Sequence, residues 1–275
     1  MTATASTKQE QDTDVEPTTV DPTTVDQARV DRIVATLESE GACIEPDVIS
    51  AAEADRANAV IGELLDKEAS ADTREAGQQR IGEIAVKHQV LRNLLCHPLV
   101  VAVWRRLLGE DMVSSTWTVN TIHPGKGKVG WHSDHPFWAM EPPYPAEWLA
   151  GQTVWMIDDL TEHNGATGYV SRSHLERRPP TSGEDWPEGG LLATGTRGSV
   201  VFGHGAWWHT STANQSDRQR SVLLGMYVKT IITPMEDMRD QLRRIDNPTE
   251  LETQIMGGNQ RIPQNIVTPH PDSTG

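Results

Sequence analysis

From Asp111 onward the chain is a succession of short runs rich in Val, Ile, Thr and Trp, separated by clusters of Pro and Gly. The runs read SSTWTVNTIHPG, KVGWHSDHP, QTVWMIDDL, GYVSRSH, GSVVFGHGAWWH and RSVLLGMYVKTIIT. Residues of these types favour strands, whereas the Pro and Gly clusters form the turns that end them. Many short strands with such turns are typical of an antiparallel sandwich or a barrel-like roll. This pattern predicts a mainly β fold.

Helical periodicity precedes the strands. Apolar residues recur at helical spacing over residues 25–40, 51–65 and roughly 86–108. Gly41 stands where the C-cap of the first helix is expected. The third segment is broken at His97-Pro98, because Pro disfavours helical conformation in the residue before it. Helical residues return over 235–245, and the chain beyond them is tail-like. We therefore predict helices packed outside an antiparallel double sheet.

The two ends of the chain differ from the middle. Residues 1–26 contain no Leu, Ile, Phe, Trp or Tyr and repeat the motif PTTVD. Such a segment buries too little apolar surface to offset the entropy lost on ordering it. We predict a disordered acidic tail over 1–26, one domain over 27–260 and a flexible C-terminal tail over 261–275.

The overall charge limits the choice of partner. The 275 residues carry a formal net charge of −15. An acidic protein repels nucleic-acid phosphates and anionic membranes, so we expect neither as a partner. Cys43 and Cys96 stand apart with no CxxC spacing, which favours reduced thiols and a cytoplasmic location. The sequence leaves the oligomeric state open.

Histidines and acids gather in two stretches. The first, GWHSDHPFW at 130–138, places His132 and Asp134 two residues apart on an apparent strand, so their side chains share one face. The second, GHGAWWHTSTANQSDRQR at 203–220, supplies a further imidazole at His209. Two His and one carboxylate form the facial triad of non-haem iron(II) sites, which leaves other coordination positions open. A His-x-Asp triplet alone is a weak signal, because such triplets also occur by chance.

The second stretch also holds a hydroxyl and two guanidinium groups. Ser211 lies two residues after His209 and shares its face on a regular strand. Arg218 and Arg220 follow an expected turn. A guanidinium pairs bidentately with a carboxylate and stays charged, which suits the distal carboxylate of 2-oxoglutarate. Alternation does not choose between the two arginines, because both lie on one face.

Three segments together resemble the phytanoyl-CoA dioxygenase family. They are HSD at 132–134, NGATGYVSRSH at 164–174 and GSVVFGHGAWWHTSTANQSDRQRSVLLGMY at 198–227. The resemblance covers roughly residues 28–230. It implies a double-stranded β-helix, which is a cupin-like jelly roll, and an enzyme that uses iron(II), 2-oxoglutarate and O2.

The resemblance also assigns roles to single residues. It implies that His132, Asp134 and His209 are the metal ligands and the catalytic residues. The family's cosubstrate arginine follows the second ligand His by eleven residues, which corresponds to Arg220. A hydroxyl two residues after that His assists the arginine and corresponds to Ser211. The chain departs from the family pattern at residue 172, where Arg replaces the usual Gly, and this bears on the shape of that loop alone.

The activity implied by the resemblance is hydroxylation of an unactivated C–H bond in a small molecule. A secondary metabolite or an amino-acid-like compound is the expected substrate. The same cofactors could instead support desaturation, cyclisation, epimerisation or endoperoxide formation, because the outcome depends on how the substrate lies. A non-catalytic metal-binding β roll, acting as a scaffold or sensor, is the alternative from a different class.

Other residues near these motifs divide into two groups. Trp138, Trp148 and His135 are predicted substrate contacts, because they stand close to the metal motif and to a long loop. The predicted structural residues are His174, His204, Trp155, Trp207, Asp158 and Asp159. The loops over 139–150 and 175–190 are long enough to be lids.

Overall fold

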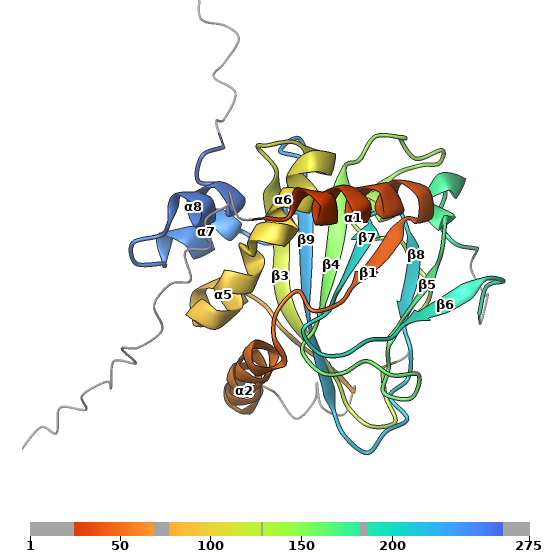
Figure 1. Ribbon diagram of the computed structural model, residues 1–275, viewed down its shortest axis with the longest axis horizontal. Helices are drawn as coiled ribbons and strands as arrows, with labels where there is room; N and C mark the ends of the chain where they lie inside the picture. The colour runs from red at the N-terminus through yellow and green to blue at the C-terminus, as the bar shows by residue number, and fades with distance from the viewer. Residues whose placement is uncertain (1–24, 69–76, 128, 182–185, 261–275) are drawn as a thin grey trace, which may run out of the picture.

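Two antiparallel sheets face each other in the computed structural model, which describes residues 25–68, 77–127, 129–181 and 186–260 (Figure 1). The larger sheet has the strand order β1-β7-β4-β9-β3-β2, and the smaller sheet has the order β6-β5-β8. The strands are β1 (Ala42–Glu45), β2 (Gln78–Ile81), β3 (Val113–Ile122), β4 (Ala150–Met156), β5 (Thr167–Val170), β6 (Gly190–Ala193), β7 (Val200–His204), β8 (Trp208–Ser211) and β9 (Arg220–Val228). The predicted antiparallel double sheet is confirmed.

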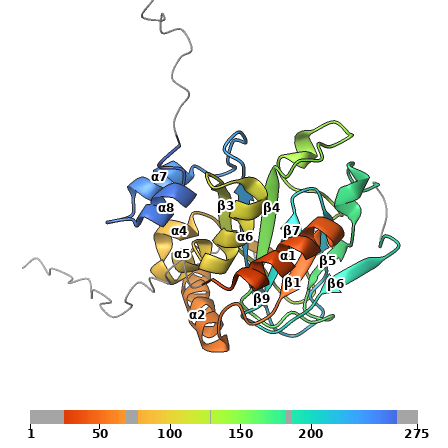
Figure 2. The same cartoon turned by 45° about the horizontal axis from the view of Figure 1, so that its top comes forward.

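Helices pack beside the strands, and α1 and α6 lie over the outer face of the six-stranded sheet (Figure 2). The helices are α1 (Gln27–Glu40), α2 (Ala51–Glu68), α4 (Ile84–Lys87), α5 (Gln89–Leu95), α6 (Pro98–Leu108), α7 (Met238–Arg243) and α8 (Glu250–Ile255). α1 ends at Gly41 with a φ of 75°, as the sequence predicts. The third predicted helix is divided into α4, α5 and α6, because His88 is extended and Pro98 starts a new helix.

Alternation along the central strands separates a helix-facing core from an inner face. On β3, Trp117 packs into the core under the helices, whereas Asn120 lies on the opposite, inner face. Trp104 of α6 is fully buried in the same core and stacks on Tyr227, with ring centroids 6.1 Å apart. A Cβ added at Gly151 would lie 2.1 Å from Trp104 Cζ3, so only glycine lets β4 approach this ring.

The segment KVGWHSDHP does not form the predicted strand. Among its described residues, His132 forms an isolated bridge to His209 and Val129 N–H donates to the Ser211 carbonyl at 3.1 Å. The chain then turns into a short 3-10 helix over Phe137–Ala139. Pro136 has no N–H to continue a ladder, so regular pairing cannot extend past it. His132 and Asp134 are therefore carried by a loop and not by a regular strand.

The prediction of a tail directly after residue 245 is wrong. α8 begins with a capping box, in which the Thr249 hydroxyl accepts from Glu252 N–H and the Glu252 carboxylate accepts from Thr249 N–H. Glu252 also lies 2.7 Å from Nε of Arg92 on α5, and Ile255 is fully buried. The Thr-x-x-Glu pattern was the signal for this helix in the sequence.

Several predictions fall partly or wholly outside the described residues. The acidic tail over 1–26 lies outside them except for its last two residues, and the tail over 261–275 lies wholly outside them. Residues 182–185 of the expected lid over 175–190 also lie outside. The domain boundary at 27–260 stays a prediction.

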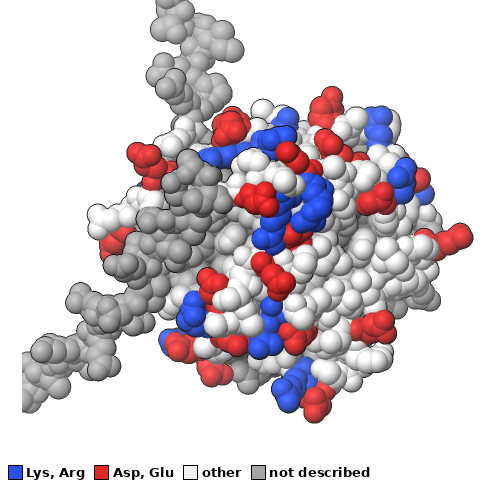
Figure 3. Space-filling model, viewed as in Figure 1, with Lys and Arg blue, Asp and Glu red and all other residues white. Residues whose placement is uncertain are grey.

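Acidic and basic side chains lie interleaved on the face that carries α1 and α6 (Figure 3). Arg106 lies 3.1 Å from Asp31, and Arg29 lies 2.6 Å from Glu45. Basic groups on this face are therefore paired locally with acids.

In the ranges that the structure describes, no helix combines the length and apolar character needed to cross a bilayer.

Candidate metal centre

Three side chains that the sequence singles out, His132, Asp134 and His209, meet at the inner face of the smaller sheet. Their possible ligand atoms all lie within 4.8 Å of one another. Nε2 of His132 is 3.8 Å from Oδ1 of Asp134, and Nε2 of His209 is 3.4 Å from Oδ2 of the same carboxylate. Two imidazoles and one carboxylate thus converge on one point, as a facial triad requires.

Hydrogen bonds hold these groups in place. His132 and His209 exchange two backbone N–H···O bonds of 3.0 Å, and Asp134 N–H donates to a carbonyl of the turn before β8 at 3.1 Å. Nδ1 of His132 is 2.8 Å from the carbonyl of Gly130, and Nδ1 of His209 is 3.4 Å from that of Trp207. Because a carbonyl only accepts, each Nδ1 carries the proton and each Nε2 keeps the lone pair that a metal needs.

The chemistry of this donor set fits a divalent metal. Burial lowers the pKa of His209 to about 4, so its imidazole is neutral at physiological pH. Oδ2 of Asp134 is buried and has no hydrogen-bond partner among the described residues. Burying a carboxylate oxygen without a partner is unfavourable, and a cation bound at this point would remove that penalty.

The three side chains line a cavity of about 140 Å³ between the two sheets. The six-stranded sheet contributes Thr116, Thr118, Asn120, Gln152, Val154, Arg220, Val222, Leu224 and Met226 to its wall. The smaller sheet contributes Thr167, Thr210 and Ser211 beside His209. The wall therefore combines polar groups near the metal candidates with an apolar surface on β4 and β9.

Arg220 is a buried cation that faces this cavity with part of its guanidinium unused. It is 2% exposed, and its Nε and Nη2 donate to the carbonyl of Gly165. Nη1 has no partner among the described residues. Burial lowers the pKa of Arg220 to about 10, against the effect of nearby Asp158, so the group stays charged at neutral pH. Ser211 lines the same cavity, so both residues predicted to bind the cosubstrate share it with the metal candidates.

Comparison with known proteins identifies the relatives of this chain. The model of the family described as phytanoyl-CoA dioxygenase (PhyH) matches residues 37–222. The chain belongs to this family. It is similar to dioxygenase af480 from Aspergillus fumigatus, with 29% identity over 169 residues, 58% of this chain and 50% of that protein. It is also similar to 2-aminoethylphosphonate dioxygenase from the uncultured bacterium HF130_AEPn_1, with 27% identity over 172 residues, 58% of this chain and 62% of that protein. The chain thus matches only about half to three-fifths of the length of these curated relatives.

A solved structure supports the fold assignment for this PhyH member. The epimerase SnoN, in complex with Fe3+, alpha ketoglutarate and nogalamycin RO, is similar with a TM-score of 0.62 and 20% identity. The match covers 82% of this chain and 92% of that one. At this identity the likeness shows the fold alone, and it confirms the predicted double-stranded β-helix.

The three predicted substrate contacts of this PhyH chain lie in different places. Trp138 lines the cavity and is 56% exposed. His135 lies beside it, with ring centroids 5.9 Å apart, but its Nε2 is 2.9 Å from a carbonyl of the loop after β9 and it is not among the lining residues. Trp148 packs on Trp104 and His204, with centroids 6.4 and 4.2 Å away. The structure therefore does not bring Trp148 to the cavity, because its ring fills space between α6 and β7.

The residues predicted to be structural contact other protein groups and are not among the residues that line the cavity. His204 accepts a hydrogen bond of 2.9 Å from Ala206 N–H, and burial lowers its pKa to about 3. Asp158 accepts one of 2.7 Å from the side chain of Asn58. Trp155 is fully buried in the helix-facing core. His174 and Asp159 likewise contact protein groups, and Trp207 stacks on the ring of His209, with centroids 4.8 Å apart.

Some cavity residues were missed in the sequence. Asn120 and Gln152 are buried, and their side-chain oxygens have no hydrogen-bond partner within the described ranges. Arg80 of β2 also lines the cavity. On β3 the alternate polar residues Thr116, Thr118 and Asn120 could have predicted a polar inner face of the sheet. The sequence of β2 contains no comparable pattern.

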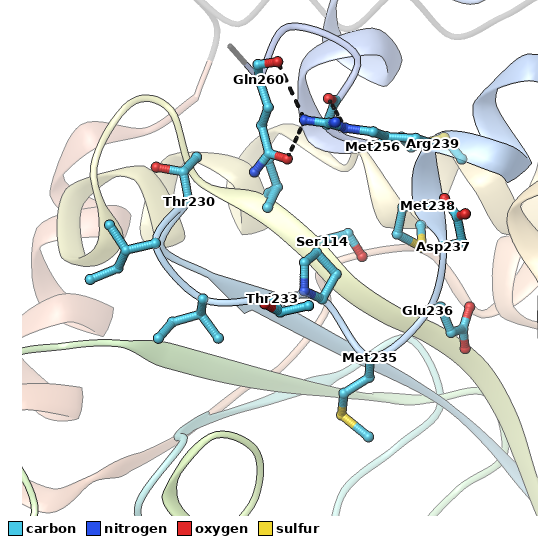
Figure 4. Close-up of a pocket in the computed structure, with 15 residues that line it drawn as sticks. Ser114, Thr230, Thr233, Met235, Glu236, Asp237, Met238, Arg239, Met256 and Gln260 are labelled. Carbon is cyan, nitrogen blue, oxygen red and sulfur yellow. Dashed lines mark hydrogen bonds between the residues drawn. The ribbon is translucent and has the colours of Figure 1, made fainter. Parts of the chain in front are cut away.

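A second hollow, of about 440 Å³, lies beside β3, α7 and the loop after β9 (Figure 4). Its charged groups are engaged within the protein: Arg239 donates to Gln260, and Glu236 accepts from Thr116. Figure 4 shows the side chain of Met235 pointing away from Arg239 and Gln260. Met235 lines both this hollow and the metal cavity. The larger hollow is therefore a neighbour of the candidate site, and its Arg239 and Glu236 are engaged in hydrogen bonds within the protein.

Proposed function

We propose that this chain is an iron(II)- and 2-oxoglutarate-dependent dioxygenase that hydroxylates an unactivated C–H bond of a small molecule. One observation carries the proposal. A single cavity holds the convergent set His132, Asp134 and His209 and, separately, a buried guanidinium with unused donors. A 2-oxo dicarboxylate needs a metal for its keto-acid end and a cation for its distal carboxylate. Membership in a family of dioxygenases supports the same activity.

In this proposal His132, Asp134 and His209 hold the iron. The bound iron supplies oxygen activation, which amino-acid side chains do not provide. The chain contributes position and charge. The carbonyl partners of both Nδ1 atoms fix the imidazole tautomers, and the Asp134 carboxylate offsets part of the metal charge.

Arg220 and Ser211 bind the distal carboxylate of 2-oxoglutarate in this proposal. The Gly165 carbonyl holds the guanidinium in place, so little side-chain freedom is lost when the anion binds. The group is charged and buried, and a charge-assisted hydrogen bond is stronger where little water screens it. Arg220 therefore orients the cosubstrate while the surrounding wall keeps water out.

Hydroxylation is the proposed outcome because the curated relatives at 27% and 29% identity are named dioxygenases. Epimerisation is the second candidate, since a protein of similar fold is named an epimerase. A cavity of about 140 Å³ suits a small secondary metabolite or an amino-acid-like compound as substrate. The free thiols of Cys43 and Cys96 support a reducing location such as the cytoplasm.

Anaerobic addition of iron(II) and 2-oxoglutarate tests this function. We expect a weak visible charge-transfer band, because a chelating 2-oxo acid needs open metal positions. Asp134→Ala should abolish the band, and His135→Ala should retain it, because the His135 ring lies outside the cavity. Iron binding without the band would instead identify a metal-binding scaffold. A succinate-release screen of metabolites, followed by mass spectrometry, then separates hydroxylation, which adds one oxygen atom, from epimerisation, which leaves the mass unchanged.

A further inference from the structure

The cavity contains one positive charge more than iron and 2-oxoglutarate would balance. Its charged side chains are Asp134, Arg220 and Arg80, with both histidines neutral as metal ligands. The two charges of iron(II) and the two carboxylates of 2-oxoglutarate cancel, and Asp134 offsets Arg220. The guanidinium of Arg80 is then left without a counter-charge.

Arg80 reaches the cavity from the edge strand β2. It stands opposite Asn120 of β3 in the antiparallel register, so both side chains project to the same face of the sheet. Both of them line the cavity. Arg80 is exposed, as is Trp138, and the two therefore mark the place where the cavity opens to solvent.

Arg80 is available to bind a ligand. Its backbone pairs with β3, but its guanidinium makes no hydrogen bond or ion pair with another described residue. Many of the other described arginines are paired with acids, such as Arg197 with Asp55 at 2.7 Å. The chain has 39 acidic residues and 24 Lys and Arg, so acidic partners are plentiful. A guanidinium that stands at a cavity mouth without an acidic partner among the described residues favours an anionic ligand over a structural role.

We propose that Arg80 binds the negatively charged group of the substrate, and that the substrate is therefore a small organic anion. This inference rests on the proposed function. A guanidinium matches the oxygens of a carboxylate, a phosphate or a phosphonate bidentately. The apolar part of the substrate packs against Trp138, Leu224 and Met235, which line the same cavity.

Calorimetric titration of the anaerobic protein, loaded with iron(II) and saturating 2-oxoglutarate, tests the inference. The probes are phenylacetate, benzylphosphonate and phenylacetamide, which is the neutral counterpart of phenylacetate. We expect at least one anion to bind about tenfold or more tightly than the amide. Arg80→Gln should abolish this preference, and Arg80→Lys should keep part of it. Arg218→Gln removes an exposed arginine outside the cavity and should keep all of it. The ratio of the two anion affinities distinguishes a carboxylate site from a phosphonate site.

Several results would overturn the inference. One is equal binding of both anions and the amide to the unmodified protein, and another is an unchanged preference in Arg80→Gln. Loss of the visible band on addition of phenylacetate would mean that this anion displaces 2-oxoglutarate, which also contradicts a separate substrate position. Absence of the band before any probe is added would refute the proposed function itself, and so separates the two failures.

Discussion

Replacing Arg220 by Gln removes a buried positive charge from the cavity and leaves an amide that can still donate to Gly165. In the unmodified protein Nη1 of Arg220, which has no partner among the described residues, can make a charge-assisted hydrogen bond to a carboxylate. Such a bond is worth about 1.5–3 kcal/mol. Because 1.4 kcal/mol corresponds to a tenfold change in affinity, the Kd for 2-oxoglutarate should rise about 10- to 150-fold.

The assay is an anaerobic titration of the iron(II)-loaded protein with 2-oxoglutarate, followed at the visible band. Iron stoichiometry is measured in parallel and should stay near that of the unmodified protein, since Arg220 is not a candidate metal ligand. Arg218→Gln is the matched control, because it removes the same charge from an exposed position two residues earlier. An equal or larger loss of affinity in this control would refute the assignment of Arg220 to the cosubstrate.

Three further predictions concern the metal, the core and the last helix. Asp134→Ala should lose stoichiometric iron binding by elemental analysis, whereas His135→Ala should retain it. Trp148→Ala should destabilise the fold by about 2 kcal/mol in urea denaturation, because its partly buried ring packs against the core. Trp138→Ala should change stability by less than about 0.5 kcal/mol, since Trp138 is 56% exposed. Thr249→Ala should cost about 1 kcal/mol by loss of the capping box, and no change in the urea midpoint would contradict that cap.

Local sequence patterns placed most of the central strands and two helices, although the segment KVGWHSDHP is a loop and not the predicted strand. The candidate triad was predicted from these patterns together with the family resemblance. Apolar periodicity placed α1 and α2, and Gly41 adopts the left-handed conformation expected of a C-cap. His132 and Asp134 were recognisable because they lie two residues apart, and the family resemblance supplied His209. Their convergence did not require the regular strand that the sequence suggested, since the bridge between His132 and His209 and the hydrogen bond from Asp134 N–H hold the loop in place.

Arg80 shows what local patterns do not contain. β2 is a four-residue strand, QQRI, without a clear apolar alternation. Arg80 meets the cavity only because β2 pairs with β3 in a register that sets it opposite Asn120. Such a register depends on contacts between segments far apart in the chain, so it cannot be predicted from the sequence of either segment alone.

Trp138 and Trp148 show the same division. Both are tryptophans beside the same loop, and the sequence gives no reason to assign them different roles. Trp138 nevertheless lines the cavity, whereas Trp148 packs on Trp104 of α6. The sequence by itself determined the available chemistry: two imidazoles, a carboxylate, a hydroxyl and guanidinium groups at recognisable spacings. The packing of the two sheets and the helices decided which of these groups share one cavity and which are absorbed into the core, because burial depends on what lies opposite a side chain in space.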